Sequence, residues 1–167
     1  MTFNPYEEVN SYFVFHQRVV ILNILKVAKS QTRKTIDGAE VHQRYLRMCY
    51  EYDIEPVFRN SILYALKAFE VAGFIKIKTG MKITKLDLGE YTIDDWITAI
   101  MQSPDFAKIK RQYTVKEAIR ELAKKQKSIT RAQIKEASGI EDPSEEVFKL
   151  VKSGIIMEVG PDDIRWV

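Results

Sequence analysis

The stretch DIEPVFRNSILYALKAFEVAGFIKIKTGMKIT, residues 53–84, predicts a helix followed by a basic hairpin. Pro56 is tolerated only near the start of a helix, and Gly73 can supply the left-handed residue that ends one. Between these positions, apolar residues recur at helical spacing and predict one side that faces a core. They are Phe58, Ile62, Leu66 and Phe69.

Beyond this helix the apolar period changes from that of a helix to that of a strand. Two isoleucines alternate there with two lysines, in the order Ile75, Lys76, Ile77 and Lys78. Thr79-Gly80 then supplies a turn into residues 82–84. The pattern predicts a hairpin whose outer face is basic.

Three further elements are expected before this helix. FHQRVVILNILKVAK, residues 15–29, is apolar on nearly three sides, which predicts a buried helix. After the polar residues 31–34, residues 34–36 are long enough for a short strand. Asp37 is a good N-cap for a helix over residues 39–52, with Glu40 three residues on and Val41, Tyr45 and Met48 facing inward.

The order helix, strand, helix, helix, hairpin is that of a winged-helix domain, so we expect the third helix to read duplex DNA and the hairpin to act as a wing. Hydrogen-bond donors and an aromatic ring lie opposite the core side, where they could contact base edges or phosphate. The candidate DNA-binding residues of this half are Arg59, Asn60, Tyr64, Lys67, Lys76, Lys78 and Lys82. The alternative is an ordinary solvated face whose lysines keep an edge strand from pairing with another chain.

The composition is that of a globular domain or of two small ones, with 167 residues, 46% hydrophobic and 29% charged. The net charge of +3 is small, so any electrostatic contact with DNA must come from local clusters. Cys49 is the single cysteine, which excludes an internal disulfide and suits a reducing cytosol. The sequence has no apolar run of membrane-spanning length and starts without the basic region of a signal peptide, so we expect a cytoplasmic protein.

The motifs of common enzyme and cofactor sites are missing from the sequence. It contains no GxxxxGK[ST] phosphate loop, no HExxH and no nucleophile elbow. His16 and His42 fall in separate helices without paired cysteines. We therefore expect no catalytic residue, no metal, no nucleotide and no other cofactor.

The first residues predict a helix that could serve in self-association. Asn4, Pro5 and Glu7 read as N-cap, first helical position and capping-box acid, ahead of an aromatic-rich side. Packing on the next helix and a homodimer contact are both consistent with this pattern.

A helical connector is expected over residues 91–111, between domains at 1–90 and 112–167. Thr92 can cap a helix with an apolar stripe, Ser103-Pro104 breaks it, and a short helix over 105–111 follows. Because this segment lacks glycine and serine runs, we expect a structured connector that holds the domains at a defined angle. The predicted fold class is α+β, mostly helical, with tandem winged-helix domains.

The second domain repeats the same plan in smaller form. Thr114 with Glu117 and Thr130 with Gln133 predict capping boxes, and a terminal hairpin follows a third helix that Asp142-Pro143 opens. The third helix and the hairpin tip carry carboxylates that would repel a duplex, at Glu145, Glu146, Asp162 and Asp163. The candidate phosphate contacts are therefore Lys116, Arg120 and Lys124 on the first helix, unless these belong to a solvated face laced with Glu117 and Glu121. A partner protein or a second copy of the chain is the alternative role for this domain.

FHQRVVILNIL, GAEVHQRYLRMC and LKAFEVAGFI resemble the C-terminal winged-helix domain of archaeal origin-recognition initiators, which are AAA+ proteins. The resemblance covers residues 13–85. Its most specific pieces are His16, Glu40-Val41, Tyr45, Glu70 and Gly73-Phe74-Ile75. It implies binding to origin duplex, with the recognition helix in the major groove and the wing in the minor groove.

Two departures from that family limit the resemblance. Asn60 and Ser61 stand where arginines are common early in the recognition helix, so the family's base contacts do not carry over. The phosphate loop of the family's ATPase module is also missing. The second domain is only weakly similar to the module that ends archaeal replicative helicases.

The prediction is a double-stranded DNA-binding protein of archaeal, plasmid or viral origin. It would act in replication initiation or in transcription regulation by docking and not by chemistry. The alternative is a protein-protein adaptor, because winged helices also serve as interaction modules and the second one is acidic where DNA would bind.

Overall fold

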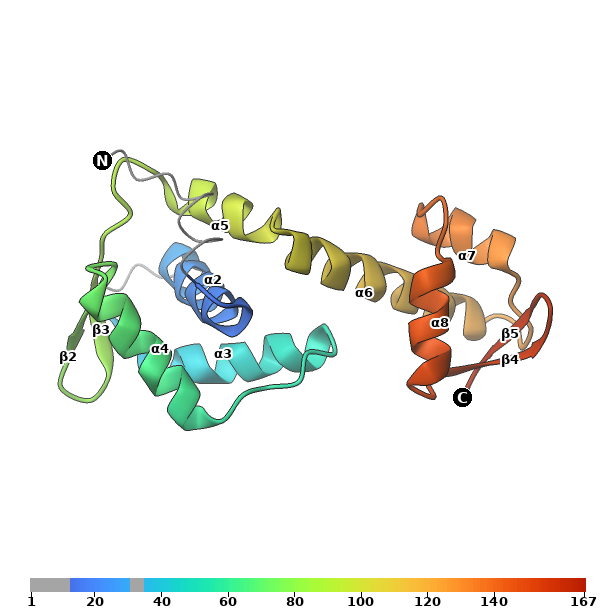
Figure 1. The fold of residues 1–167 in the computed structure, drawn as a ribbon, viewed down its shortest axis with the longest axis horizontal. Coiled ribbons are helices and arrows are strands. Elements are labelled where there is room, and N and C mark those ends of the chain that lie inside the picture. The colour runs from blue at the N-terminus through green and yellow to red at the C-terminus, as the bar shows by residue number, and fades with distance from the viewer. Residues whose placement is uncertain (1–12, 31–34) are drawn as a thin grey trace. The chain divides into compact units, whose positions relative to one another are not determined.

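The computed structural model describes residues 13–30 and 35–167, and it divides into two compact units, residues 1–106 and 107–167. The predicted N-terminal helix with Asn4, Pro5 and Glu7, its proposed dimer contact and the polar break at 31–34 lie outside the described residues. Figure 1 labels all of the described helices and strands except β1.

The first unit has the predicted order of elements (Figure 1). The helices are α2 (Phe15–Ser30), α3 (Gly38–Glu51), α4 (Arg59–Val71) and α5 (Ile93–Met101). The strands are β1 (Ile36–Asp37), β2 (Ile75–Lys78) and β3 (Lys82–Leu86), which form an antiparallel sheet in the order β1-β3-β2.

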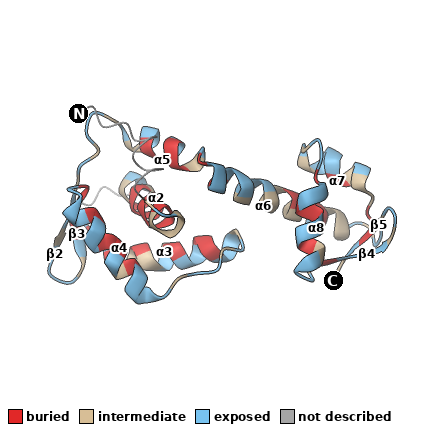
Figure 2. Cartoon of the chain, in the orientation of Figure 1, coloured by how far each residue is buried: buried red, intermediate tan, exposed pale blue. Residues whose placement is uncertain are grey.

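Helix α2 is the centre of this unit because it is apolar on nearly all sides. Residues 18–25 are all buried, and α2 packs against α3, α4 and α5 (Figure 2). The inward residues predicted for α3, namely Val41, Tyr45 and Met48, are buried, as is Cys49. Asp37 caps α3 as predicted, because its side chain accepts from the Ala39 N–H at 2.9 Å.

Helix α5 also belongs to the core of the first unit. Thr92 and Asp95 form a capping box at its start, and Trp96 is fully buried. The Trp96 indole N–H donates to the Leu88 carbonyl oxygen at 3.1 Å, and its ring lies 4.8 Å from that of Phe74. The helix that the sequence assigned to a connector therefore fills part of a core with α2.

The second unit repeats the order of helix, strand bridge, two helices and hairpin. It contains α6 (Pro104–Ala123) from residue 107 onward, the isolated bridge Ile129↔Ile164, α7 (Arg131–Ser138), α8 (Ser144–Lys152), β4 (Ile156–Gly160) and β5 (Asp163–Trp166). Its apolar core comprises Val115, Ile119, Ile129, Ile134, Val147, Leu150, Ile156 and Ile164. Thr130 and Gln133 form the predicted capping box at α7. The fold is thus α+β and mostly helical, with the winged-helix order in both units.

The predictions of a separate short helix over 105–111 and of a capping box at Thr114 were wrong. Helix α6 is continuous from Pro104 to Ala123, and the Thr114 hydroxyl donates to the Lys110 carbonyl oxygen at 2.8 Å inside the helix. No proline or glycine interrupts residues 105–123, so the chain has no reason to leave the helix there.

Candidate DNA-binding surface

One side of α4 packs in the core, and the side that was predicted to contact DNA is exposed. Ile62, Ala65, Leu66 and Phe69 are buried. Arg59, Asn60, Tyr64 and Lys67 are all exposed, and Leu63 is half-buried. The structure therefore brings the four candidate residues of this helix onto one solvent-facing surface.

Phe58 does not belong to the core, contrary to the prediction. It is the N-cap residue of α4, and its side chain is 88% exposed. The chain at this residue is still extended, with φ −60° and ψ 149°, so the helical spacing from Phe58 to Ile62 does not apply. Sequence periodicity could not show this, because the helix begins one residue later.

The turn before α4 is held by a buried tyrosine. The Tyr45 hydroxyl accepts from the Val57 N–H at 2.9 Å and lies 2.8 Å from Nδ1 of His16. Burial raises the pKa of Tyr45 to about 12, and burial lowers the pKa of His16 below its ordinary 6.5. Two of the residues that carry the family resemblance, His16 and Tyr45, thus help to position the start of α4.

The hairpin places lysines directly opposite one another. Lys78 pairs with Lys82 and Lys76 with Lys85 across β2 and β3, and all four are exposed. Like charges in opposing positions destabilise a hairpin. An anionic partner would relieve this repulsion. Lys85 was missed from the sequence because β3 was expected to end at Thr84 and in fact runs to Leu86.

Two hydrogen bonds fix the hairpin to the helices. The Gly38 N–H donates to the Met81 carbonyl oxygen at 2.9 Å, which joins the hairpin turn to the first residue of α3. The Glu70 carboxylate of α4 accepts from the Ile77 N–H at 3.0 Å. Helix α4 and the hairpin are therefore parts of one surface.

The cations of this surface are not neutralised by neighbouring carboxylates. Within residues 13–30 and 35–167, none of the following takes part in an ion pair: Arg59, Lys67, Lys76, Lys78, Lys82 and Lys85. Helix α4 also has no acidic residue in its first turn. Its positive dipole end is therefore open to phosphate.

Within the described residues, two of the candidate cations of the second unit, unlike those of the first, form ion pairs with neighbouring glutamates. Arg120 is paired with Glu117 at 3.2 Å, and Lys124 is paired with Glu121. Lys116 is half-buried. This matches the alternative of a solvated face laced with carboxylates, so α6 offers DNA less free positive charge than the first unit does.

Glu146 is buried, which corrects the prediction that it would face and repel a duplex from the start of α8. It is 4% exposed and forms an ion pair with Nε of Arg111. Gln112 donates to the Glu146 carbonyl oxygen at 3.1 Å. Glu145 remains exposed, where it pairs with Lys149 at 2.8 Å.

The carboxylates at the second hairpin tip have partners as well. Asp162 accepts from the Arg131 N–H at 2.8 Å, and Asp163 pairs with Arg165 at 2.8 Å. The hydrogen bonds from Arg165 and Ser128 hold the pKa of Asp163 below its ordinary value. Both acids of the hairpin tip are therefore tied to groups within their own unit.

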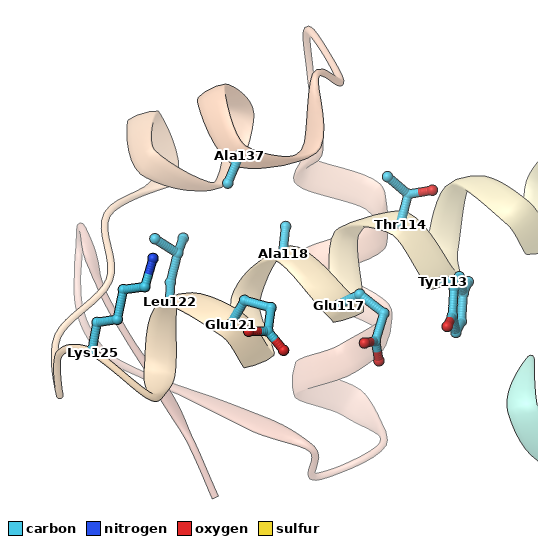
Figure 3. Close-up of a pocket in the computed structure, with 8 residues that line it drawn as sticks. All are labelled: Tyr113, Thr114, Glu117, Ala118, Glu121, Leu122, Lys125 and Ala137. Atoms are coloured by element: carbon cyan, nitrogen blue, oxygen red, sulfur yellow. The ribbon is translucent and has the colours of Figure 1, made fainter.

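Among the hollows of the described chain, two lie between a helix that carries candidate residues and a neighbouring helix. One of about 220 Å³ lies between α3 and α4 and is lined in part by His42, Arg59 and Leu63. The other, of about 430 Å³, lies between α6 and α7, where Ala118 and Ala137 point toward each other (Figure 3). Neither contains a set of groups typical of catalysis.

Within the part of the chain that the structure describes, no three His, Cys, Asp or Glu side chains gather as a metal site. The rings of His16 and His42 each contact the ring of Tyr45, with centroids 6.1 and 6.5 Å away. The helices of the described segments are all too short or too polar to span a lipid bilayer.

The comparison with protein families agrees with this geometry. The family described as CDC6, C terminal winged helix domain, matches residues 8–93, just over half of the chain. The matched range covers every element from α2 to β3 and ends where α5 begins. No curated protein and no solved structure gives a significant match. The chain therefore belongs to the family of CDC6 C-terminal winged-helix domains.

Proposed function

We propose that the first unit binds double-stranded DNA, with α4 in the major groove and the β2–β3 hairpin on the adjacent backbone or minor groove. The observation that carries this proposal is the set of exposed cations on α4 and the hairpin that form no ion pair within the described residues. Opposed lysines are unfavourable in the free protein and favourable next to phosphates.

The proposed role is docking in replication initiation or transcription regulation, in the cytoplasm of an archaeon or in a plasmid or viral system. It requires no cofactor and no catalytic residue. The family membership supports such a role, and the exposed side chains of α4 and the hairpin supply positive charge and hydrogen-bond donors.

The salt dependence of duplex binding tests this proposal. We expect the affinity of the full chain for a labelled random-sequence duplex to fall steeply with salt, with a log-log slope of about −4 to −5 if most of the six cations meet phosphates. Fluorescence anisotropy between low and moderate salt measures the slope. Binding that is absent at low salt, or that does not respond to salt, contradicts the proposal.

Two charge-matched variants show which unit binds the phosphates. The first replaces Lys76, Lys78 and Lys82 by glutamine, and the second replaces Lys116, Arg120 and Lys124 by glutamine. Each removes three positive charges. We expect the first variant to flatten the slope by about one for each phosphate that is no longer neutralised, and the second to change it little. The reverse result would transfer the DNA contact to the second unit.

A protein-binding role for the second unit is the second candidate. It is favoured by the pairing of Arg120 and Lys124 with glutamates and by the hollow between α6 and α7, which Leu122 lines with Ala118 and Ala137 (Figure 3). A chain that acts only as an adaptor would show no saturable duplex binding at any salt concentration.

A further inference from the structure

The Phe58 side chain neither caps α4 nor packs in the core. The N-cap residues of α3, α5 and α7 are Asp37, Thr92 and Thr130, and each accepts a hydrogen bond from its own helix. The side chains of Phe58 and of Pro143, the N-cap of α8, make no cap bond, but Pro143 is buried whereas Phe58 is 88% exposed. A large apolar side chain in water at a position that favours a polar cap breaks two local rules at once, which points to function.

The surroundings of Phe58 indicate an anionic partner. The next three residues, Arg59, Asn60 and Ser61, are all exposed. Arg59 forms no ion pair within the described residues, and the first turn of α4 contains no acid. The lysines of the hairpin extend the positive charge beyond the helix. A phenylalanine beside these groups would meet the same duplex that they bind.

The position of Phe58 at the start of α4 limits what its side chain can contact. In helix-turn-helix proteins, the N-terminal residues of the recognition helix contact base edges in the major groove. The Phe58 carbonyl oxygen accepts the Ser61 N–H at 2.9 Å, so the residue is joined to the first turn and enters the groove with it. Phenylalanine has no hydrogen-bond donor or acceptor, and the apolar group that the major groove offers is the 5-methyl of thymine.

We propose that Phe58 is a specificity-determining residue that packs against a thymine 5-methyl group in the major groove. The inference rests on the proposed function, because it requires that α4 enter DNA. It adds a contact made by an apolar group, whereas Arg59, Asn60 and Tyr64 would act through hydrogen bonds.

Replacement of thymine by deoxyuridine tests the contact directly, because it removes only the methyl group. Duplexes are first selected from a random pool by the full chain, and each thymine of the selected sequence is then replaced in turn. We expect one replacement to weaken binding roughly threefold to fivefold, as for the removal of one buried methyl group. The Phe58→Ala variant should bind the thymine and deoxyuridine duplexes equally, and Phe58→Leu should keep part of the difference.

Val71→Ala is the matched control, since Val71 is the last residue of α4, at the end away from Phe58, and is 90% exposed. It should retain the full response to deoxyuridine. Thermal melting should be unchanged in all three variants because the altered side chains lie outside the core.

The outcomes separate this inference from the proposed function. The thymine contact is overturned if Phe58→Ala selects the same sequence as the wild type and is weakened by deoxyuridine to the same extent. Salt-sensitive binding by the wild type would still support the DNA proposal in that case. A wild-type chain that binds duplex without any sequence preference has the same consequence. Failure of the wild-type chain to bind duplex at all overturns both, and would assign Phe58 to a protein contact.

Discussion

Gly38 and Met81 join the hairpin to the helix pair. The Gly38 N–H donates to the Met81 carbonyl oxygen at 2.9 Å, and a Cβ atom on Gly38 would lie 2.8 Å from that same oxygen. The close approach explains why glycine begins α3. Met81 has a φ of 59°, which shows that the turn itself adopts an uncommon conformation to make this contact.

Gly38→Ala should therefore displace the hairpin. The added Cβ meets backbone atoms, which cannot rotate away, so we expect a decrease of about 1–3 kcal/mol in the free energy of unfolding and a weaker affinity for duplex. Urea denaturation and anisotropy measure the two effects. Ala39→Ser, at the exposed neighbouring position, is the control and should change neither. Unaltered stability in Gly38→Ala would show that the hairpin moves freely.

Arg59→Ala and Lys67→Ala should each weaken duplex binding without unfolding the protein. Both side chains are exposed on α4, opposite the buried Ile62 and Leu66. If Arg59 makes a bidentate base contact, its removal should cost about 1–3 kcal/mol and relax sequence preference. The affinities of each variant for a selected duplex and for a random-sequence duplex measure both the loss of binding and the loss of sequence preference. Equal affinities for wild type and both variants would remove α4 from the DNA surface.

Lys78→Gln should affect stability and binding in opposite directions. It removes the repulsion with Lys82 across the hairpin, which should stabilise the free protein by about 0.2–1 kcal/mol. It also removes a phosphate contact, so affinity should fall similarly for all sequences. Denaturation and anisotropy on the same preparation test the sign of each effect. A decrease in both would mean that Lys78 has a stabilising partner in the fold.

Glu146→Gln should destabilise the second unit. Glu146 is 4% exposed and paired with Arg111, whose side chain is about half exposed, so the cost should be about 1–3 kcal/mol, below that of a wholly buried pair. Hydrogen exchange of the β4 and β5 amides measures it. Glu145→Gln is the matched control, because Glu145 is exposed and its replacement should leave exchange unchanged. Equal exchange in both variants would show that the ion pair between Glu146 and Arg111 does not stabilise this unit.

The first unit should lose stability as the pH falls below about 6.5. Burial lowers the pKa of folded His16 from 6.5, so the unfolded chain binds the proton more readily in that range. The contribution is fully present above 6.5, and it is lost as the pH falls from 6.5 through the folded pKa. Urea denaturation from pH 7.5 to 5 measures the trend. His16→Gln should flatten it, and a slope identical in the variant would assign the trend to another group.

Local patterns in the sequence were enough to predict the elements that form through interactions between near neighbours in the chain. Side-chain period separated α4 from the β2–β3 hairpin, and the short-range hydrogen bonds at Asp37, Thr92 and Thr130 formed where polar cap residues stand before helices. Such features depend on residues within one turn of each other, so a single chain is enough to predict them. The exposed reading side of α4 followed from the same periodicity.

Other features could be seen only in the folded protein, because they depend on contacts between residues far apart in the chain or on the residue at which a helix begins. Glu146 is buried by Arg111, 35 positions away, although its place in the first turn of α8 predicted an exposed acid. Phe58 is exposed because α4 starts only after it, and helical spacing cannot fix a start to one residue. Gly38 is required by the Met81 carbonyl oxygen, a contact across 43 positions. The free energy of such contacts comes from packing and desolvation in the folded protein, which no local pattern encodes.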